Sequence, residues 1–324
     1  MIHREYRIGM VEVFRLKQGI RRQRAAEIHP LRAHLFEHRN DGIDLFRPHM
    51  AAFARVRVQA ANMLSASFLM GGPPVFAAYG LGEALCFHLG GGAKVTGMAL
   101  IHHNREALGQ SFYGVFSPQQ RRAAAFTFGK SANGSDYSSK NPHALSLQPV
   151  ACAHLRVSII WELEQVAGVK EAREFLHRAR LSGGLVTGHG EIVLEDSLEA
   201  AFDRVGNGYV VTDRRDMLED KGKNQAELLV EALGAQPSAG EDNTWLSAAC
   251  LGYAAITPFE HRGGARCGYT HAFAEPLVGM VQYRSLRQWR KEADAEEAIW
   301  RPVWLDDRRG AFVLRQEQTE PEDM

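Results

Sequence analysis

The sequence predicts an α+β fold, and three observations support this prediction. Residues 53–60 and 153–160 alternate apolar and polar side chains with the two-residue period of a β-strand. Residues 74–89 repeat apolar side chains at helical spacing. With the remaining patterns they give the order strand–helix–strand, long loop, strand–helix–strand, which is the order of the split βαβ unit in a ferredoxin-like sheet.

The first half of this unit begins with a strand that has one basic face. Alternation in residues 53–60 places Arg55, Arg57 and Gln59 on one side and apolar residues on the other. The helix of residues 74–89 follows two prolines, ends before three glycines, and is expected to pack on the apolar side of the strand. Residues 94–103 predict the second strand.

The second half begins after a loop-like stretch, residues 104–150, that is rich in Gly, Ser and Asn. Loops of this length in compact domains are usually functional or disordered, and residues 121–130 predict a projecting hairpin within it. Residues 169–181 predict a helix that ends at Ser182-Gly183-Gly184, and residues 185–194 predict a strand. We expect the helices to cover one face of the sheet and to leave the other open.

The composition shifts along the chain predict five parts. They are a basic N-terminal extension (1–52), the sheet unit (53–194) with an insertion at about 104–150, an acidic linker or surface excursion with one helix at 224–233 (195–244), a C-terminal part that returns to the sheet or forms a small lobe (245–314), and a disordered acidic tail (315–324).

Composition excludes several classes of protein. The chain has 324 residues, 45% of them hydrophobic, with 38 Lys and Arg against 38 Asp and Glu, as expected of a folded protein with one or two cores. No apolar stretch suits a membrane span, and the N-terminus lacks the apolar core of a secretion signal, so we expect a cytoplasmic protein. Residues 1–57 carry 12 Lys and Arg against 6 Asp and Glu, which indicates either an electropositive face or a solvated basic arm.

The sequence contains only weak motifs for catalysis or for binding a metal or cofactor. The four cysteines are scattered, and no His-Glu-x-x-His pair occurs, so neither a disulfide framework, a metal site nor a cofactor is expected. Signatures of a nucleophile elbow or a phosphate-binding glycine loop are also missing. His102 or His103, at a strand end, could serve as the general base of a metal-independent ribonuclease. The alternative is a histidine pair without catalytic duty.

Nucleic-acid binding fits more of the residues. Arg55, Arg57, Gln59 and Asn62 would line the first strand and the turn after it, where long donors reach phosphates and base edges. The glycine pair at 183–184 allows close approach of a sugar-phosphate chain, and the insertion interleaves Arg121, Arg122 and Lys130 with Phe126 and Phe128. Each feature also has a structural explanation, a solvated strand face, a helix cap or core phenylalanines, so their convergence favours binding.

These residues also form a familiar series of motifs. Arg57-Val-Gln59-Ala-Ala-Asn62-Met-Leu-Ser65, followed by Gly71-Gly-Pro73 and residues 77–85, resembles the signature of the Csy-two family. That family is the Cas-five-type subunit of type I-F CRISPR surveillance (Cascade) complexes. Residues 154–158, 180–184, 208–214, 245–246 and 252–258 continue the resemblance in the same order.

The resemblance implies a non-catalytic RNA-binding protein that holds the 5′ handle of the CRISPR RNA (crRNA) in antiviral defence. It implies an RNA-recognition-motif-like palm of the RAMP type with a hairpin thumb at about 104–150. The expected partners are the crRNA, a Cas-seven-type backbone subunit, a large subunit where the system has one, and target DNA in the assembled complex. The RNA-contact candidates are then Arg55, Arg57, Gln59, Asn62, Ser65, Arg121, Arg122, Lys130, Gly183, Gly184 and Arg266.

Three positions depart from the family pattern: Ala60 replaces an asparagine, Gly72 a phenylalanine and Glu83 a histidine. The basic extension is also longer than expected. One variant of the type I-F system lacks the large subunit, and there the Cas-five-type protein itself contacts the target-flanking (PAM) duplex, which would suit the extension. Other hypotheses that stay open are the repeat endoribonuclease that uses His102 or His103, and a scaffold whose acidic segment 195–242 binds a protein.

Overall fold

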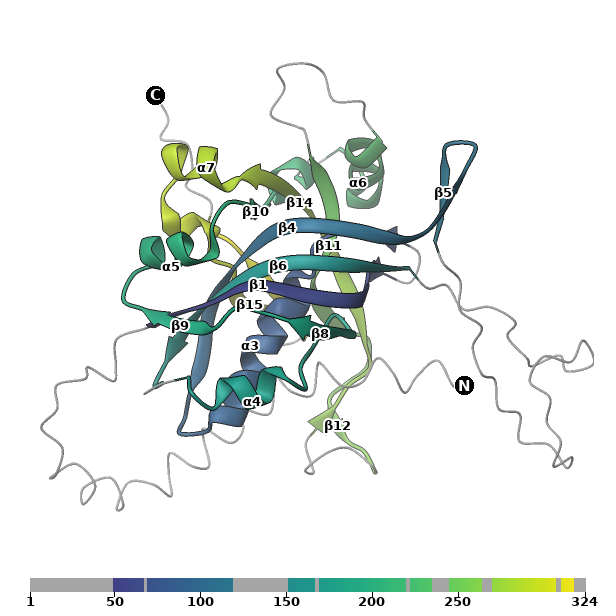
Figure 1. Cartoon of the computed structure of the whole chain (residues 1–324). Helices are drawn as coiled ribbons and strands as arrows, with labels where there is room; N and C mark the ends of the chain where they lie inside the picture. Colours follow the sequence, from purple (N-terminus) through teal and green to yellow (C-terminus); the bar gives the residue numbers. More distant parts are fainter. Residues whose placement is uncertain are drawn as a thin grey trace, which may run out of the picture.

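A computed structural model describes residues 49–66, 69–118, 151–166, 169–219, 222–234, 245–263, 270–306 and 310–317. Most of them form a curled antiparallel sheet, described with 12 strands, so the α+β prediction is confirmed (Figure 1). Among the expected contact residues, Arg121, Arg122, Lys130 and Arg266 lie outside the described residues, as do Phe126, Phe128 and nearly all of the basic extension.

The described elements are as follows. The strands are β1 (His49–Asn62), β2 (Leu64–Ala66), β3 (Leu69–Met70), β4 (Lys94–Phe112), β5 (Val115–Pro118), β6 (Cys152–Glu164), β7 (Arg180–Leu181), β8 (Gly184–Gly188), β9 (Ile192–Glu195), β10 (Tyr209–Asp213), β11 (Leu246–Ala255), β12 (Glu260–His261), β13 (Thr270–His271), β14 (Ala274–Ser285), β15 (Arg301–Asp306) and β16 (Ala311–Arg315). The helices are α3 (Val75–Leu89), α4 (Ala172–Leu176), α5 (Leu198–Val205), α6 (Gln225–Gly234) and α7 (Leu286–Glu292), with 3-10 turns η2 (Arg215–Leu218) and η4 (Ala295–Ala298).

Strand β1 lies near the middle of the sheet. It pairs antiparallel with β8 and β9 on one side and with β6 on the other, and β6 pairs with β4. The four segments that the sequence predicted as strands are therefore neighbours. Strand β4 continues past residue 103 and turns into β5, so the first part of the expected loop is a projecting hairpin (Figure 1). Tyr113 and Gly114 both have positive φ, as a tight two-residue turn requires.

The sheet continues beyond β4 in the order β10, β14, β11, β16, β15. The prediction of a linker at 195–244 is wrong for its first part, because α5 packs on the sheet and β10 lies between β4 and β14. Helix α5 begins after Ser197, whose Oγ accepts a hydrogen bond from the amide of Ala200, and it buries Leu198, Ala201, Phe202 and Val205. The acidic residues on its exposed side led to the prediction of a linker, although the segment is an amphipathic helix. The predicted helix at 224–233 is confirmed as α6.

Residues 169–194 differ from their prediction. Helix α4 has five residues, and β7 and β8 follow it as a hairpin whose turn holds Ser182 and Gly183, both at positive φ. The hydroxyl of Ser182 donates to the carbonyl of Asn62 at 2.9 Å, which fixes the turn against the end of β1. The predicted single strand is two strands, β8 and β9, and Gly190 between them donates its amide to the carbonyl of Ala54 in β1.

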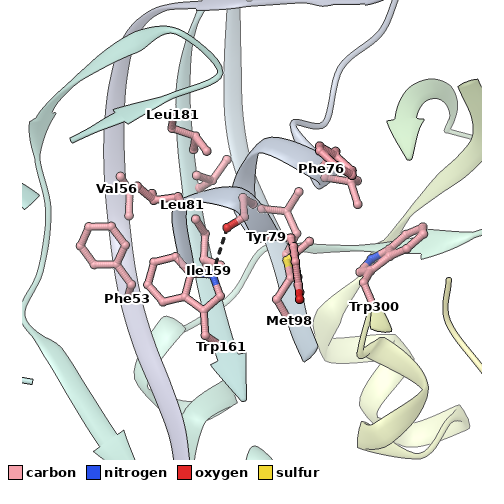
Figure 2. Packing of buried hydrophobic residues seen from close by; sticks show 14 of the residues in the cluster. Phe53, Val56, Phe76, Tyr79, Leu81, Met98, Ile159, Trp161, Leu181 and Trp300 are labelled. Carbon is pink, nitrogen blue, oxygen red and sulfur yellow. Dashed lines mark hydrogen bonds between the residues drawn. The ribbon is translucent and has the colours of Figure 1, made fainter. Parts of the chain in front are cut away.

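The larger core lies between α3 and one face of the sheet (Figure 2). Trp161 on β6 is fully buried, stacks on Phe53 of β1, and donates its indole N–H to the carbonyl of Ala78 in α3 at 3.0 Å. A Cβ at Gly82 would lie 2.5 Å from that indole nitrogen, so this glycine lets the helix approach the sheet. The predicted packing of α3 on the apolar side of β1 is confirmed.

A second core lies on the opposite face, where α5, α7 and η4 pack over the sheet. Phe202 of α5 meets Trp289 of α7 with ring centroids 6.1 Å apart. The expectation that helices cover one face is therefore wrong: α3 and α4 cover one face, and α5 and α7 cover part of the other. The uncovered part of that second face carries the polar side of β1.

The C-terminal part, 245–314, returns to the sheet as β11, β14, β15 and β16. The prediction of a disordered tail at 315–324 is wrong for its first residues, because Gln316 is buried; residues 318–324 lie outside the described residues. Its Oε1 accepts from the amide of Asp213, and its Nε2 donates to the carbonyls of Val211 and Ala298. Within the described ranges, no helix combines the length and apolar character needed to cross a membrane.

Candidate nucleic-acid interface

Two bulges shape the polar side of β1. Between Phe53 and Val56, and again between Val58 and Ala61, two residues of β1 oppose one residue of β6. Arg55 and Ala60, one in each bulge, have φ angles of 55° and 54°. Bulges redirect side chains and often lie beside functional sites. The position of Arg55 is therefore set by its bulge rather than by the strict alternation that the sequence suggested.

Arg57 on β1 and Arg156 on β6 are direct cross-strand partners. Both are exposed, on the face opposite the buried Val56 and Val58. The guanidinium of Arg57 extends over Gly188, where an added Cβ would lie 2.5 Å from its Nη2. Like charges placed opposite each other destabilise a sheet. Among the described residues, no carboxylate forms an ion pair with either arginine, so the pair presents an unneutralised positive patch.

The buried hydroxyl of Ser158 organises the residues behind this patch. Its Oγ accepts from the amide of Arg55 at 2.9 Å and lies 2.7 Å from Nε2 of His103. The other ring nitrogen, Nδ1, lies 2.9 Å from the carbonyl of Asn207. Because a carbonyl can only accept, the neutral ring carries its proton on Nδ1, and Nε2 accepts from the Ser158 hydroxyl. Both nitrogens of His103 are therefore engaged in holding β4, β6 and the loop before β10 together.

The electrostatics of His103 agree with a neutral ring. Burial lowers its pKa most, the hydrogen bond to Asn207 raises it, and the nearby charges of Arg156 and Arg55 lower it. Gly208 makes this position possible, since a Cβ there would lie 2.8 Å from Nδ1 of His103. The imidazole thus contributes shape and a hydrogen bond to the site while the arginines contribute its charge.

An open hollow of about 600 Å³ lies beside these residues. Its polar lining includes Arg55, His103, Arg156, Asn207, Tyr209 and Arg287, which come from β1, β4, β6, the start of β10 and α7. The sequence predicted Arg55 as a contact. The alternation in 153–160 could also have identified Arg156, because His154, Arg156 and Ser158 share one side, whereas no sequence signal pointed to Arg287.

The remaining expected contacts fall into two groups. Gln59, Asn62 and Gly183 are exposed near the end of β1. Gly184 and Ser65 are buried and make structural contacts. A Cβ at Gly184 would lie 2.7 Å from the backbone of β1, and the hydroxyl of Ser65 donates to the carbonyl of Ala248 at 3.1 Å. In the first group, Gln59 and Asn62 are exposed on β1 beyond Arg57, and Gly183 is exposed in the β7–β8 turn beside the end of β1.

His102 lies on the other side of β4, as expected for adjacent strand residues. It is 6% exposed, its ring meets Tyr283 edge-on, and its Nε2 has no hydrogen-bond partner among the described residues. Burial, followed by the charges of Arg105 and His103, lowers the pKa of His102 to about 4. It is a neutral, shielded imidazole that does not line the hollow.

Comparison with known proteins identifies a family. The family model described as CRISPR-associated protein (Cas_Csy2) matches residues 52–310, and the basic stretch before residue 52 precedes the match. The comparison with curated proteins found no significant match. Because the matched segment covers most of the chain, the recognition made from the motifs at 57–85 is confirmed. The chain belongs to the Cas_Csy2 (Csy-two) family and is a CRISPR-associated Cascade subunit.

Proposed function

We propose that this chain is the non-catalytic subunit that holds the 5′ handle of the crRNA in a type I-F-like Cascade. The observation that carries the proposal is the facing pair Arg57 and Arg156, exposed and without a carboxylate partner among the described residues. Such a pair is stabilised by an anion that binds both guanidinium groups. Successive phosphates of a polynucleotide supply that charge.

The strand arrangement supports an RNA-recognition-motif-like (RAMP) palm. The order β8, β1, β6, β4 with all neighbours antiparallel, and with α3 between β1 and β4 and α4 between β6 and β8, is the order of the split βαβ unit. In RNA-recognition motifs the exposed sheet face binds single-stranded RNA. The projecting β4–β5 hairpin stands where the thumb is expected.

The residues at the end of β1 would add recognition of bases. Gln59 and Asn62 are exposed beyond Arg57, and amide side chains both donate to and accept from base edges. The Oδ1 of Asn62 already accepts from the amide of Leu64, which leaves its NH₂ group available to a ligand. The handle would thus lie along β1, with phosphates at the arginines and bases at the amides. A Cas-seven-type backbone subunit, a large subunit where present, and target DNA complete the expected assembly.

The state of both histidines supports binding without cleavage. A general base must reach the 2′-hydroxyl of the RNA, but His102 is buried and both ring nitrogens of His103 are already hydrogen-bonded. Incubation of the chain with repeat RNA should therefore leave the RNA intact. Cleavage that is lost in His103→Gln would replace this proposal with the endoribonuclease hypothesis.

The decisive experiment is a titration of the full chain with single-stranded repeat RNA at several salt concentrations. Affinity should fall as salt rises, with a slope in the double-logarithmic plot of about −0.7 for each phosphate contacted. Arg57→Ala should weaken binding by roughly 10- to 100-fold. Arg173→Ala, which removes an exposed arginine from α4 on the other face of the sheet, should not.

The Arg173→Ala control also identifies the results that would contradict the proposed function. Equal affinities for the wild type, Arg57→Ala and Arg173→Ala would contradict the proposal. So would an Arg57→Ala chain that loses its thermal transition while it still binds RNA, because Arg57 would then be a structural residue. Co-purification with the neighbouring Cas proteins should bring down crRNA.

A role in duplex binding is a second candidate for the basic extension. Residues 1–57 carry 12 Lys and Arg but only 6 Asp and Glu, and the family match begins at residue 52. Deletion of residues 1–50 should spare handle binding and reduce the affinity of the assembled complex for target-flanking duplex DNA. An unchanged DNA affinity would remove this role.

A further inference from the structure

Two exposed aromatic rings lie stacked on the surface beside the basic hollow. Tyr209, at the start of β10, and Trp245, before β11, have ring centroids 5.9 Å apart and nearly parallel planes. Tyr209 is 41% exposed and Trp245 is 67% exposed. Large aromatic side chains are normally placed so that they bury most of their area. A pair that leaves the outer indole face in solvent is therefore available to stack with a ligand.

The backbone of Trp245 is unusual as well. Its φ is 64°, a conformation that is rare for bulky residues, and its carbonyl accepts the amide of Tyr283 at 3.1 Å. Strain of this kind persists where the surroundings hold it, and it clusters at ligand-binding sites. The hydrogen bond from Tyr283 holds the backbone of Trp245 in this conformation, in which the indole lies on Tyr209.

Tyr209 connects this pair to the hollow, because it also lines that space. The volume of about 600 Å³ lies within the roughly 300–1,000 Å³ of small-ligand sites. Three arginines, Arg55, Arg156 and Arg287, line it, and no carboxylate occurs among its described lining residues. On α7 the next arginine, Arg290, pairs with Asp203, whereas Arg287 has no ion pair among the described residues.

We propose that the hollow and the Tyr209–Trp245 pair form a subsite for one unstacked nucleotide of a single-stranded RNA. The base stacks on the exposed indole face of Trp245. The phosphates next to it bind Arg287 and Arg156, and the side chain of Asn207 is within the same hollow to contact the sugar or base. This inference rests on the proposed RNA-binding function and extends it to residues away from β1.

The chemistry favours a single-stranded polynucleotide over a free mononucleotide or a duplex. The hollow is open and continues toward the Arg57–Arg156 pair through Arg156, which belongs to both. A strand with several phosphates can contact both places, and unpaired bases are free to leave the stack. In a duplex the bases are already stacked on each other.

The test uses the full chain and a single-stranded RNA that carries 5-iodouridine at one position at a time. We expect photocrosslinks to Trp245 or Tyr209 from one position of the RNA, located by mass spectrometry. Trp245→Ala should reduce affinity by roughly 5- to 100-fold, as removal of a base-stacking ring does. Trp245→Phe should restore most of the affinity, and Arg287→Ala should lower the salt slope by about 0.7.

Phe87→Ala is the matched control, because it removes an exposed aromatic ring from α3 on the other side of the sheet and should leave affinity unchanged. If Trp245→Ala and Arg287→Ala bind like the wild type while Arg57→Ala does not, the subsite is wrong and the proposed function stands. If Arg57→Ala also binds like the wild type, the proposed function fails too. If a matched duplex binds as tightly as the single strand and Trp245→Ala has no effect, the subsite is wrong and the arginines bind duplex phosphates instead.

Discussion

Arg57 and Arg156 face each other across the β1–β6 ladder, on the part of the second sheet face that α5 and α7 leave uncovered. The main chain fixes this arrangement, since the two residues are register partners and neither strand can move without breaking the ladder. The protein thus holds two like charges together before any ligand binds. A binding site that is already organised saves the cost of assembling it when the ligand arrives.

Replacement of Arg156 by Ala should have opposite effects on stability and on binding. Removal of the facing charge should raise the free energy of unfolding by about 0.2–1 kcal/mol at low salt, because cross-strand repulsion disappears. RNA affinity should fall by about 1.5–3 kcal/mol. Urea unfolding at low salt and at 1 M salt, beside RNA titration, measures both. A stability gain that persists unchanged at 1 M salt would contradict the electrostatic explanation.

Ala60 is a site where substitution should stabilise the chain. Its φ of 54° costs an L-residue about 1–2 kcal/mol, whereas glycine adopts it freely and asparagine tolerates it. The family pattern that residues 57–65 resemble has an asparagine at this position. We therefore expect Ala60→Gly and Ala60→Asn to raise the free energy of unfolding, by about 1 kcal/mol for glycine. A chemical denaturation series checks this, and destabilisation by both variants would show that the methyl group packs productively.

Gly184 should resist substitution. A Cβ there would meet the carbonyl of Gln59 and the amide of Ala61 at 2.7 Å, and backbone atoms cannot move aside as a flexible side chain can. Gly184→Ala should destabilise the chain by about 1–3 kcal/mol and displace β8 from β1. Gly234→Ala, at a position with open space around the added methyl, is the control. Equal melting temperatures for the two variants would refute this close approach.

His102 should make the chain sensitive to acid. Its pKa is about 4 in the folded state against an ordinary value of 6.5, so below pH 6.5 the unfolded chain binds a proton that the folded chain does not. Above pH 6.5 the His102 imidazole is neutral in both states and does not lower the free energy of unfolding. As the pH falls from 6.5 toward 4, the free energy of unfolding decreases by on the order of 3 kcal/mol. His102→Phe should flatten the pH dependence of the unfolding free energy between pH 6.5 and 4. An unchanged slope would exclude His102 as its source.

The elements that could be predicted from the sequence are those whose pattern is local. The alternation in 53–60 and 153–160 and the helical spacing in 74–89 correspond to β1, β6 and α3, because one buried face imposes its period on the residues themselves. The family could be predicted in the same way from the motif at 57–65, because its residues are adjacent in the sequence. Prediction failed where burial depends on distant partners, as for α5 and β10 in the acidic segment.

The sequence by itself determined the α+β class, the family and a basic first strand. The tertiary structure decided which residues meet: the bulges that set Arg55 apart from its neighbours, Arg156 opposite Arg57, and the hollow to which Tyr209 and Arg287 come from distant segments. The physical reason is that periodicity records which face of an element is buried, whereas a site depends on the register and packing between elements, which no local pattern contains.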